Sequence, residues 1–398
     1  MKEGWEYKML GEIASEMYRG SGIRRDQVTK EGTPCVRYGE IYTTYNISFD
    51  TCASYTNKAN ITSPKYFEHG DLLFAITGES VEDIGKTIAY LGYEKCLCGG
   101  DIICMKHHQN PKYLAYALST PDAIRQKGIG KTKLKVVHTN APALKAISIP
   151  LAPLSEQQSI VDYLDSAFAK IDAMKANAEK ALNEAKALFQ ASLKEMLEPK
   201  EGWEEKKVGD VAEIKGGKRL PKGEKLLSEP TNHMYIRVAD FNEYGTVDLD
   251  DIQYISDKVY EQIKRYIIKK EDIYISIAGT IGKSGIVPEE LDGANLTENA
   301  CRLILSRELN QRFMYYMTIS PEFIRQEMES TKISAQPKLA LTRLADILIA
   351  FPSLSEQQSI VETLDSLKSK VDRLQANYDK ISQECDALKQ AILREVFE

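Results

Sequence analysis

The chain repeats itself at a distance of about 200 residues, and this repeat constrains its fold more than any other feature. Residues 154–161, Leu-Ser-Glu-Gln-Gln-Ser-Ile-Val, recur unchanged at 354–361, and the Gly-Trp-Glu of residues 4–6 recurs at 202–204. A repeat of this length predicts a duplicated domain, because solenoid repeats run only ~20–50 residues. The 398 residues are therefore expected to hold two copies of one unit.

Each copy has two parts of different texture. Residues 1–153 and 199–353 contain short β-rich runs separated by turn signals, and residues 71–78 and 272–279 are predicted to be equivalent strands. Residues 154–198 and 354–398 follow a proline closely and each predict one long helix. We therefore expect an α+β chain of two globular domains, 1–153 and 199–353, each followed by a spacer helix, 154–198 and 354–398.

The two predicted helices carry apolar residues at 4-3 spacing, which is typical of a coiled coil. Ser155 and Ser355 are the expected N-caps, with Gln158 and Gln358 completing capping boxes. Each helix would be roughly 66 Å long at ~1.5 Å per residue. We expect the two to pair antiparallel, as a pseudo-twofold repeat. The expected seam is Ile160, Leu164, Ala167, Ile171, Met174, Ala178, Ala181, Ala185, Leu188 and Ser192 with Ile360, Leu364, Leu367, Val371, Leu374, Tyr378, Ile381, Cys385, Leu388 and Ile392.

Basic residues cluster in the globular parts although the chain carries 52 basic and 58 acidic residues, a net charge of −6. Glycine-rich basic loops suit contacts to phosphates and base edges. We also expect Arg37 and Arg237 to lie on half-buried strands that face DNA, a structural salt bridge being the alternative. The candidate DNA-binding residues are Arg19, Arg24, Arg25, Arg37, Lys131, Lys133, Lys135, Lys215, Lys218, Arg219, Arg237 and Lys283.

Patterns that would indicate catalysis fail on inspection. Three Gly-Lys-Ser/Thr triplets lack the first glycine of a phosphate-binding loop. The cysteines and histidines between Cys96 and His108 match no zinc spacing, and their alternation favours a buried strand. We expect no catalytic residues, no metal and no cofactor in this chain. Seven scattered cysteines, with no signal peptide and no membrane-spanning run, predict a cytoplasmic protein.

The arrangement resembles the specificity subunit of type I restriction–modification systems. The Trp-Glu pair at each start, Gly39-Glu40-Ile41 and above all the duplicated Ser-Glu-Gln-Gln helix start carry the resemblance over the whole chain. It implies two target recognition domains that read the halves of a bipartite double-stranded DNA site, held apart by the coiled coil. It further implies two methyltransferase subunits as partners and, for cleavage, ATP-dependent restriction subunits. S-adenosylmethionine, ATP and Mg²⁺ are then expected only in those partners.

The duplicated helix start suggests where the methyltransferase subunits bind, because identical surfaces bind identical partners. Capping accounts for the serine and one glutamine of each copy and leaves the other residues without a role. The expected methyltransferase-binding residues are Glu156, Gln157, Ile160, Val161, Glu356, Gln357, Ile360 and Val361.

Two other functions remain open from the residues alone. One is a coiled-coil adaptor with two protein-binding domains, which the clustered Arg and Lys residues disfavour. The other is the reader half of a fused methyltransferase system, which the missing cofactor motifs disfavour. A neighbouring adenine methyltransferase gene would distinguish the first reading from both.

Overall fold

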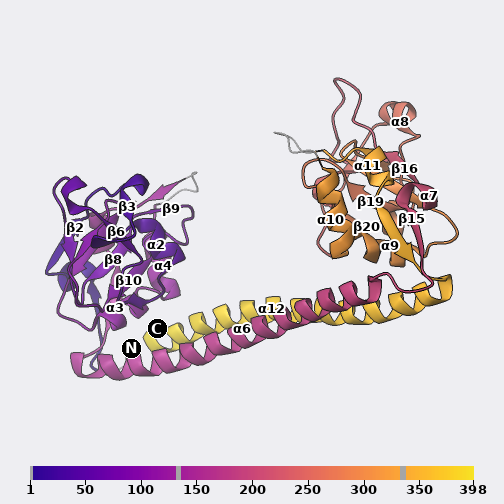
Figure 1. Cartoon of the computed structure of the whole chain (residues 1–398). Helices are drawn as coiled ribbons and strands as arrows, with labels where there is room; N and C mark the ends of the chain where they lie inside the picture. Colours follow the sequence, from indigo (N-terminus) through magenta and orange to yellow (C-terminus); the bar gives the residue numbers. More distant parts are fainter. Residues whose placement is uncertain (1–2, 131–135, 332–337) are drawn as a thin grey trace. The chain divides into compact units, whose positions relative to one another are not determined.

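The computed structural model describes residues 3–130, 136–331 and 338–398, and these form two compact units (Figure 1). Unit 1 consists of the chain up to Glu179 together with Tyr378–Glu398, and unit 2 is Lys180–Asn377. The long helices α6 (Leu154–Leu197) and α12 (Leu354–Phe397) are 44 residues each. Each unit therefore combines one globular part with a stretch of both long helices.

The globular part of unit 1 is built around two five-stranded sheets within the described residues. In spatial order, the first is β2 (Glu16–Arg19), β12 (Ile102–Lys106), β8 (Leu72–Ala75), β10 (Thr87–Tyr90) and β5 (Ser48–Phe49). The second is β3 (Val28–Thr29), β6 (Ser54–Thr56), β4 (Thr33–Val36), β11 (Cys96–Cys98) and β7 (Tyr66–Phe67). Two smaller pairs are β1 (Glu6–Met9) with β14 (Ser148–Leu151) and β13 (Val137–His138) with β9 (Thr77–Gly78).

Short helices cover these sheets and lead into α6. They are α1 (Leu10–Ile13), α2 (Tyr38–Thr43), α3 (Pro111–Ala117), α4 (Pro121–Gly128) and α5 (Ala141–Lys145), with 3₁₀ turns η1 (Arg25–Gln27) and η2 (Lys58–Asn60). Both α3 and α4 begin with proline behind a capping side chain, Asn110 and Thr120, because proline has no N–H to lose at that position.

Unit 2 repeats this plan with smaller sheets. Its strands are β15 (Glu204–Lys207) with β23 (Leu348–Phe351); β16 (Ala212–Gly216), β22 (Ala300–Leu305), β19 (Ile273–Ser276) and β20 (Ser284–Ile286); and β18 (Gln253–Tyr254), β17 (Met234–Ile236) and β21 (Asn295–Leu296). Its helices before α12 are α7 (Val208–Val211), η3 (Val238–Asp240), α8 (Asp257–Ile263), η4 (Glu289–Leu291), α9 (Gln311–Thr318), α10 (Pro321–Ser330) and α11 (Leu341–Ala345).

The predicted equivalent strands do occupy equivalent places. β8 lies between β12 and β10 in unit 1, and β19 lies between β22 and β20 in unit 2, with antiparallel pairing on both sides. Cys96 and Cys98 lie on β11 and Cys104 lies on β12, so the cysteines are buried as predicted but belong to strands of two different sheets and not to a single strand. Within the described residues, no helix has an apolar stretch long enough to cross a bilayer.

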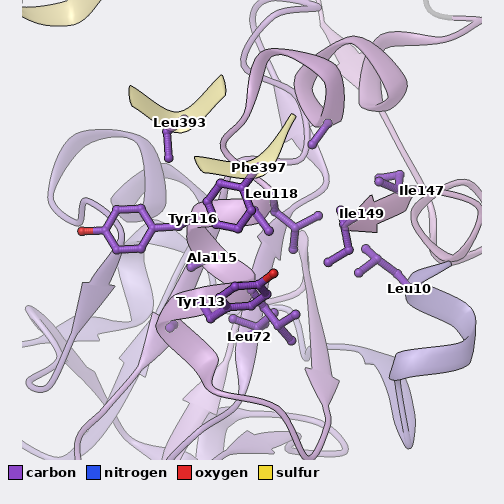
Figure 2. Packing of buried hydrophobic residues seen from close by; sticks show 14 of the residues in the cluster. Leu10, Leu72, Tyr113, Ala115, Tyr116, Leu118, Ile147, Ile149, Leu393 and Phe397 are labelled. Atoms are coloured by element: carbon purple, nitrogen blue, oxygen red, sulfur yellow. The ribbon is translucent and has the colours of Figure 1, made fainter. Parts of the chain in front are cut away.

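The largest core of unit 1 joins the globular part to both long helices. Figure 2 shows Leu393 and Phe397 of α12 beside Tyr113 and Tyr116 of α3, and Leu164 of α6 belongs to the same buried cluster. The ring of Phe397 packs edge-on against Tyr113 with centroids 5.3 Å apart. The helices of unit 1 are therefore part of its core rather than an appended stalk.

The long helices pair antiparallel in each unit, as predicted. In unit 1, Asp172 of α6 bonds Lys389 of α12 at 2.5 Å, near the start of one helix and the end of the other. In unit 2, Lys186 bonds Gln375 at 2.7 Å, and Leu193 shares a core with Leu364. The fold is thus the predicted α+β repeat with an antiparallel coiled coil.

The predicted seam is wrong at four positions, one of which is the exposed Ala181. Met174 and Leu188 are each 59% exposed, and Leu388 is 47% exposed. The buried stripe of α6 instead steps from Ile171 to Leu182 and continues at Phe189. Eleven residues make three turns of a nearly undistorted helix, so this step replaces the strict heptad along part of α6.

Candidate functional site

Four of the predicted DNA-binding arginines line one concavity of unit 1, here called the arginine pocket. Arg19, Arg24, Arg25 and Arg37 surround a space of ≈ 920 Å³. Gly20 makes its shape possible, because a Cβ there would lie 2.1 Å from the Gly99 carbonyl oxygen. The pocket gathers charges from three segments that are far apart in the sequence.

Arg19, Arg24 and Arg25 keep much of their surface in solvent, whereas the Arg37 side chain is only 29% exposed. The Arg19 guanidinium bonds Asp101 at 2.7 Å, yet its side chain is 64% exposed. Arg24 lies 3.7 Å from Asp26 and is 76% exposed. Exposed pairs of this kind contribute little, about 0–1 kcal/mol. A phosphate or base edge can therefore replace these carboxylates at small cost.

Arg37 and Arg237 do not lie on strands, contrary to prediction. Arg37 follows β4 and precedes α2, and its N–H and guanidinium both bond Glu40, at 2.8 and 3.3 Å. Arg237 follows β17 and bonds Asp240 at 2.5 Å and Asp251 at 3.1 Å. The hydrogen bond to Asp240 raises the pKa of Arg237. The structural salt bridge is thus present in both copies.

The corresponding region of unit 2 contains a second basic concavity of ≈ 670 Å³. Its lining includes Lys215, which was predicted, and Lys264 and Arg265, which were not. Lys218 lies over the ring of Tyr266 at 5.5 Å, and Arg219 bonds Glu298 at 2.6 Å. The available signal for the missed pair was the Lys-Arg-Tyr run of residues 264–266 directly after α8.

Lys283 has a structural partner and is half-buried. Its amine donates to the Phe241 carbonyl at 3.2 Å, and Lys86 of unit 1 donates in the same way to the Tyr45 carbonyl at 3.1 Å. The DNA-binding role of Lys283 stays a prediction. The predicted residues Lys131, Lys133 and Lys135 lie outside the described residues.

The duplicated helix start differs from its prediction in two ways. First, the helices begin at Leu154 and Leu354, one residue before the expected caps. The Glu356 N–H bonds the Ser353 hydroxyl at 3.4 Å, and the Glu156 N–H bonds the Pro153 carbonyl at 2.8 Å. The capping boxes predicted at Ser155 and Ser355 are therefore wrong.

Second, most of the residues predicted to bind a methyltransferase are buried inside their own unit. Ile160 is half-buried, and Glu156 and Glu356 are exposed but each accept a bond from a tryptophan indole at 3.3 Å. The five buried members cannot offer their side chains to a partner as the unit stands, whereas the role of Glu156, Glu356 and Ile160 stays a prediction. The buried members are Gln157, Val161, Gln357, Ile360 and Val361.

Comparison with known proteins finds a matching family and several similar chains. Residues 2–184 and 200–383 each match the family described as Type I restriction modification DNA specificity domain. The chain is 26% identical over 321 residues to the Type I restriction enzyme EcoBI specificity subunit of Escherichia coli, covering 72% of this chain and 65% of that protein. It is 25% identical over 283 residues to the MjaVIII specificity subunit of Methanocaldococcus jannaschii, covering 65% of this chain and 64% of that protein. The chain thus matches slightly less than two thirds of the length of these two relatives.

Solved structures share the fold. One comes from work on complex assembly and conformational transition of the type I R-M system, with a TM-score of 0.79, 18% identity and coverage of 99% of this chain and 98% of that chain. Another is the HsdS subunit from Thermoanaerobacter tengcongensis, with a TM-score of 0.55, 18% identity and coverage of 100% and 97%. With its two matched domains and their shared fold, the chain belongs to the type I restriction modification DNA specificity family.

Proposed function

We propose that this chain is the DNA specificity subunit of a type I restriction–modification complex and has no catalytic activity of its own. The observation that carries this proposal is the duplicated specificity domain with a basic concavity in each copy. Its substrate is double-stranded DNA, because exposed arginines and lysines in a concave surface suit phosphate contact and base readout.

The DNA site is bipartite and asymmetric. Each unit offers a basic concavity among its described residues, so each reads one half-site. The two linings differ. Four arginines surround the arginine pocket, whereas the cations of the unit 2 concavity are two lysines and two arginines, Lys215, Lys264, Arg265 and Arg302. Different side chains present different donor patterns to base edges, so the two half-sites have different sequences.

Its partners are two methyltransferase subunits and, for cleavage, restriction subunits, which hold S-adenosylmethionine, ATP and Mg²⁺. The two-to-one ratio is supported by duplication of the specificity domain. Since the glutamine motif is buried, the recruiting surfaces must include other residues near the helix starts. Leu154 and Leu354 occupy matching positions there and are 61% and 50% exposed.

The arginine pocket can be tested in the assembled complex with the variant Arg24→Ala, Arg25→Ala. If these side chains contact phosphates, affinity falls for every DNA sequence and the salt slope drops by about 0.9 per lost contact. If one of them reads a base, discrimination falls by ~1–3 kcal/mol at one position. The measurement is DNA affinity across a salt series, for the cognate site and for sites with single substitutions.

The matched control is Lys180→Ala, which removes an exposed cation that pairs with Glu184 on α6. It should leave the affinity and the salt slope close to those of the wild type. Equal affinity and salt slope for the pocket variant and the wild type would remove the arginine pocket from the DNA interface. A stable complex with a single methyltransferase subunit at saturation would contradict the two-to-one assembly.

A further inference from the structure

The side-chain amide of the buried glutamine at each helix start is fully hydrogen-bonded. The Gln157 oxygen accepts the Asn110 N–H at 2.9 Å, while its NH₂ donates to the Gln109 side chain at 2.8 Å and the Ala152 carbonyl at 3.0 Å. The Gln157 side chain is 0% exposed. A buried amide with all its bonds made is costly to disturb, because orphaned partners each lose ~1–3 kcal/mol.

Gln357 repeats this pattern in unit 2. Its oxygen accepts the Asn310 N–H at 2.8 Å, and its NH₂ donates to the Glu308 and Pro352 carbonyls, both at 2.9 Å. It is also 0% exposed. The same bond therefore joins the start of a long helix to the start of a domain helix, α3 or α9, in both copies.

A second attachment lies about two turns further along each long helix. Asp165 bonds Lys112 at 2.5 Å and the Tyr116 hydroxyl at 2.7 Å. Asp365 bonds Arg312 at 2.6 Å and the Tyr316 hydroxyl at 2.5 Å. The cation differs between the copies, but the carboxylate and the tyrosine are retained.

Two separated attachments fix a direction, whereas a single one allows a pivot. Gln157 and Asp165 are eight residues apart, which is roughly 12 Å along a helix at ~1.5 Å per residue. Both hold the same short helix, α3, against α6. The domain of each unit is thereby held at a defined angle to its own stretch of coiled coil.

We infer that these attachments set which separation of the two half-sites the complex accepts. Gln157 and Asp165, with Gln357 and Asp365, are positioning residues: they act on DNA through the orientation of the recognition domains. This inference rests on the proposed function. It gives the duplicated helix start a role in place of partner recruitment, and it explains why the motif is buried.

The test uses the full-length chain in complex with its methyltransferase. The recognised site is first read from the methylated positions in DNA of cells that express the wild-type complex. Methylation rates are then measured on duplexes whose half-sites are moved apart or together one base pair at a time. The test variant is Asp165→Asn, Asp365→Asn, which preserves side-chain size but removes both ion pairs.

We expect the wild type to favour one separation strongly. The variant should reduce the ratio of rates between that separation and one a base pair longer by about tenfold, equivalent to ~1.4 kcal/mol. The matched control is Asp162→Asn, Glu362→Gln. These side chains are exposed and bond Gln158 and Gln358 on their own helices, at 2.8 and 3.1 Å. The control should keep the wild-type ratio.

Melting temperature and native mass separate the possible outcomes. An unchanged ratio with a lower melting temperature would show a merely structural role, and loss of methyltransferase with an unchanged ratio would restore the recruiting role; either result overturns the inference. If the aspartate variant fails to fold, the double variant Tyr116→Phe, Tyr316→Phe takes its place. The same fall in the ratio of methylation rates is then expected, and the same results would overturn the inference. A wild-type complex that methylates no bipartite site would instead refute the proposed function.

Discussion

Units 1 and 2 place residues of opposite type, a base and an acid, at the same buried position. Lys127 lies in α4 and Glu327 lies in the equivalent helix α10, seventh from a proline in each. Lys127 donates to the Leu118 carbonyl at 2.7 Å and the Thr87 hydroxyl at 3.1 Å. Among the described residues, the Glu327 Oε1 atom is buried without a hydrogen-bond partner. The two copies therefore share the same fold, but the hydrogen bonds made by the buried polar residue differ between them.

Burial moves both groups toward their neutral forms. It lowers the pKa of Lys127 to about 7 and raises the pKa of Glu327 to about 7. An amine that loses its charge and a carboxyl that keeps its proton both avoid the cost of a buried ion. The duplication could thus diverge to opposite residue types without leaving a full charge in either core near neutral pH.

The largest expected effect is a loss of stability of unit 1 when Lys127 is replaced by glutamate, the residue type that unit 2 has at this position. In Lys127→Glu, a carboxyl oxygen would face the Leu118 carbonyl, which currently accepts a hydrogen bond. We expect unit 1 to lose about 3 kcal/mol or more, as for other buried groups left without a partner. Hydrogen exchange resolved by unit measures this loss, with Lys127→Met as the control that removes the charge but keeps the length. Equal protection in the glutamate variant and the wild type would contradict the comparison.

The pH dependence of unit 2 should be the next largest effect. The unfolded chain releases the Glu327 proton near 4.5, while the folded unit holds it to about 7, so stability contributed by this group is lost as pH rises across that window. Glu327→Gln should remove this loss and stabilise unit 2 at pH 8 by ~1–3 kcal/mol. Hydrogen-exchange protection of unit 2, measured from pH 5 to 8, tests this pH dependence. Parallel curves of protection against pH for the variant and the wild type would contradict the prediction.

Lys127 should give unit 1 the opposite pH dependence, with stability that increases as pH rises. Its folded pKa of about 7 lies below the ordinary lysine pKa of 10.5, so its contribution to stability grows as pH rises above 7 and is lost as pH falls through 7. The same hydrogen-exchange series, extended above pH 8, should therefore show unit 1 gaining protection relative to Lys127→Met. The two units thus serve as internal references for each other.

A smaller effect on stability is expected from substitutions at the C-terminal ends of the two long helices. Phe397 of α12 packs edge-on against Trp5 and Tyr113, whereas α6 has Leu197 at the equivalent place, beside a concavity of ≈ 590 Å³. Leu197→Phe should stabilise unit 2 by about 0.5–1 kcal/mol if the added ring fills that space. The reverse change, Phe397→Leu, should cost unit 1 a similar amount. Thermal or denaturant unfolding of both variants measures the pair, and a destabilised Leu197→Phe would show that the concavity cannot take a ring.

The sequence by itself determined the architecture. A 200-residue duplication, strand-like runs bounded by turns and two long helical segments each followed from local patterns, and such patterns are set by residue spacing. The sequence also pointed to the arginines that line the arginine pocket: Arg19, Arg24 and Arg25 from a glycine-rich basic cluster, and Arg37 from its repeated position in the two copies. Lys264 and Arg265 were missed because their place in a concavity depends on segments distant in the chain.

Only the tertiary structure decided what the repeated residues do. Repetition of Ser-Glu-Gln-Gln showed that the motif has a function, but a surface motif and a buried attachment look alike in sequence. The bonds of Gln157 to Asn110 and of Arg37 to Glu40 became apparent once the partner was located. The exposed Met174 and Leu188 likewise depend on how two helices and a domain share one core. Hydrogen bonding and burial are properties of contacts, and contacts between distant residues are set by the fold as a whole.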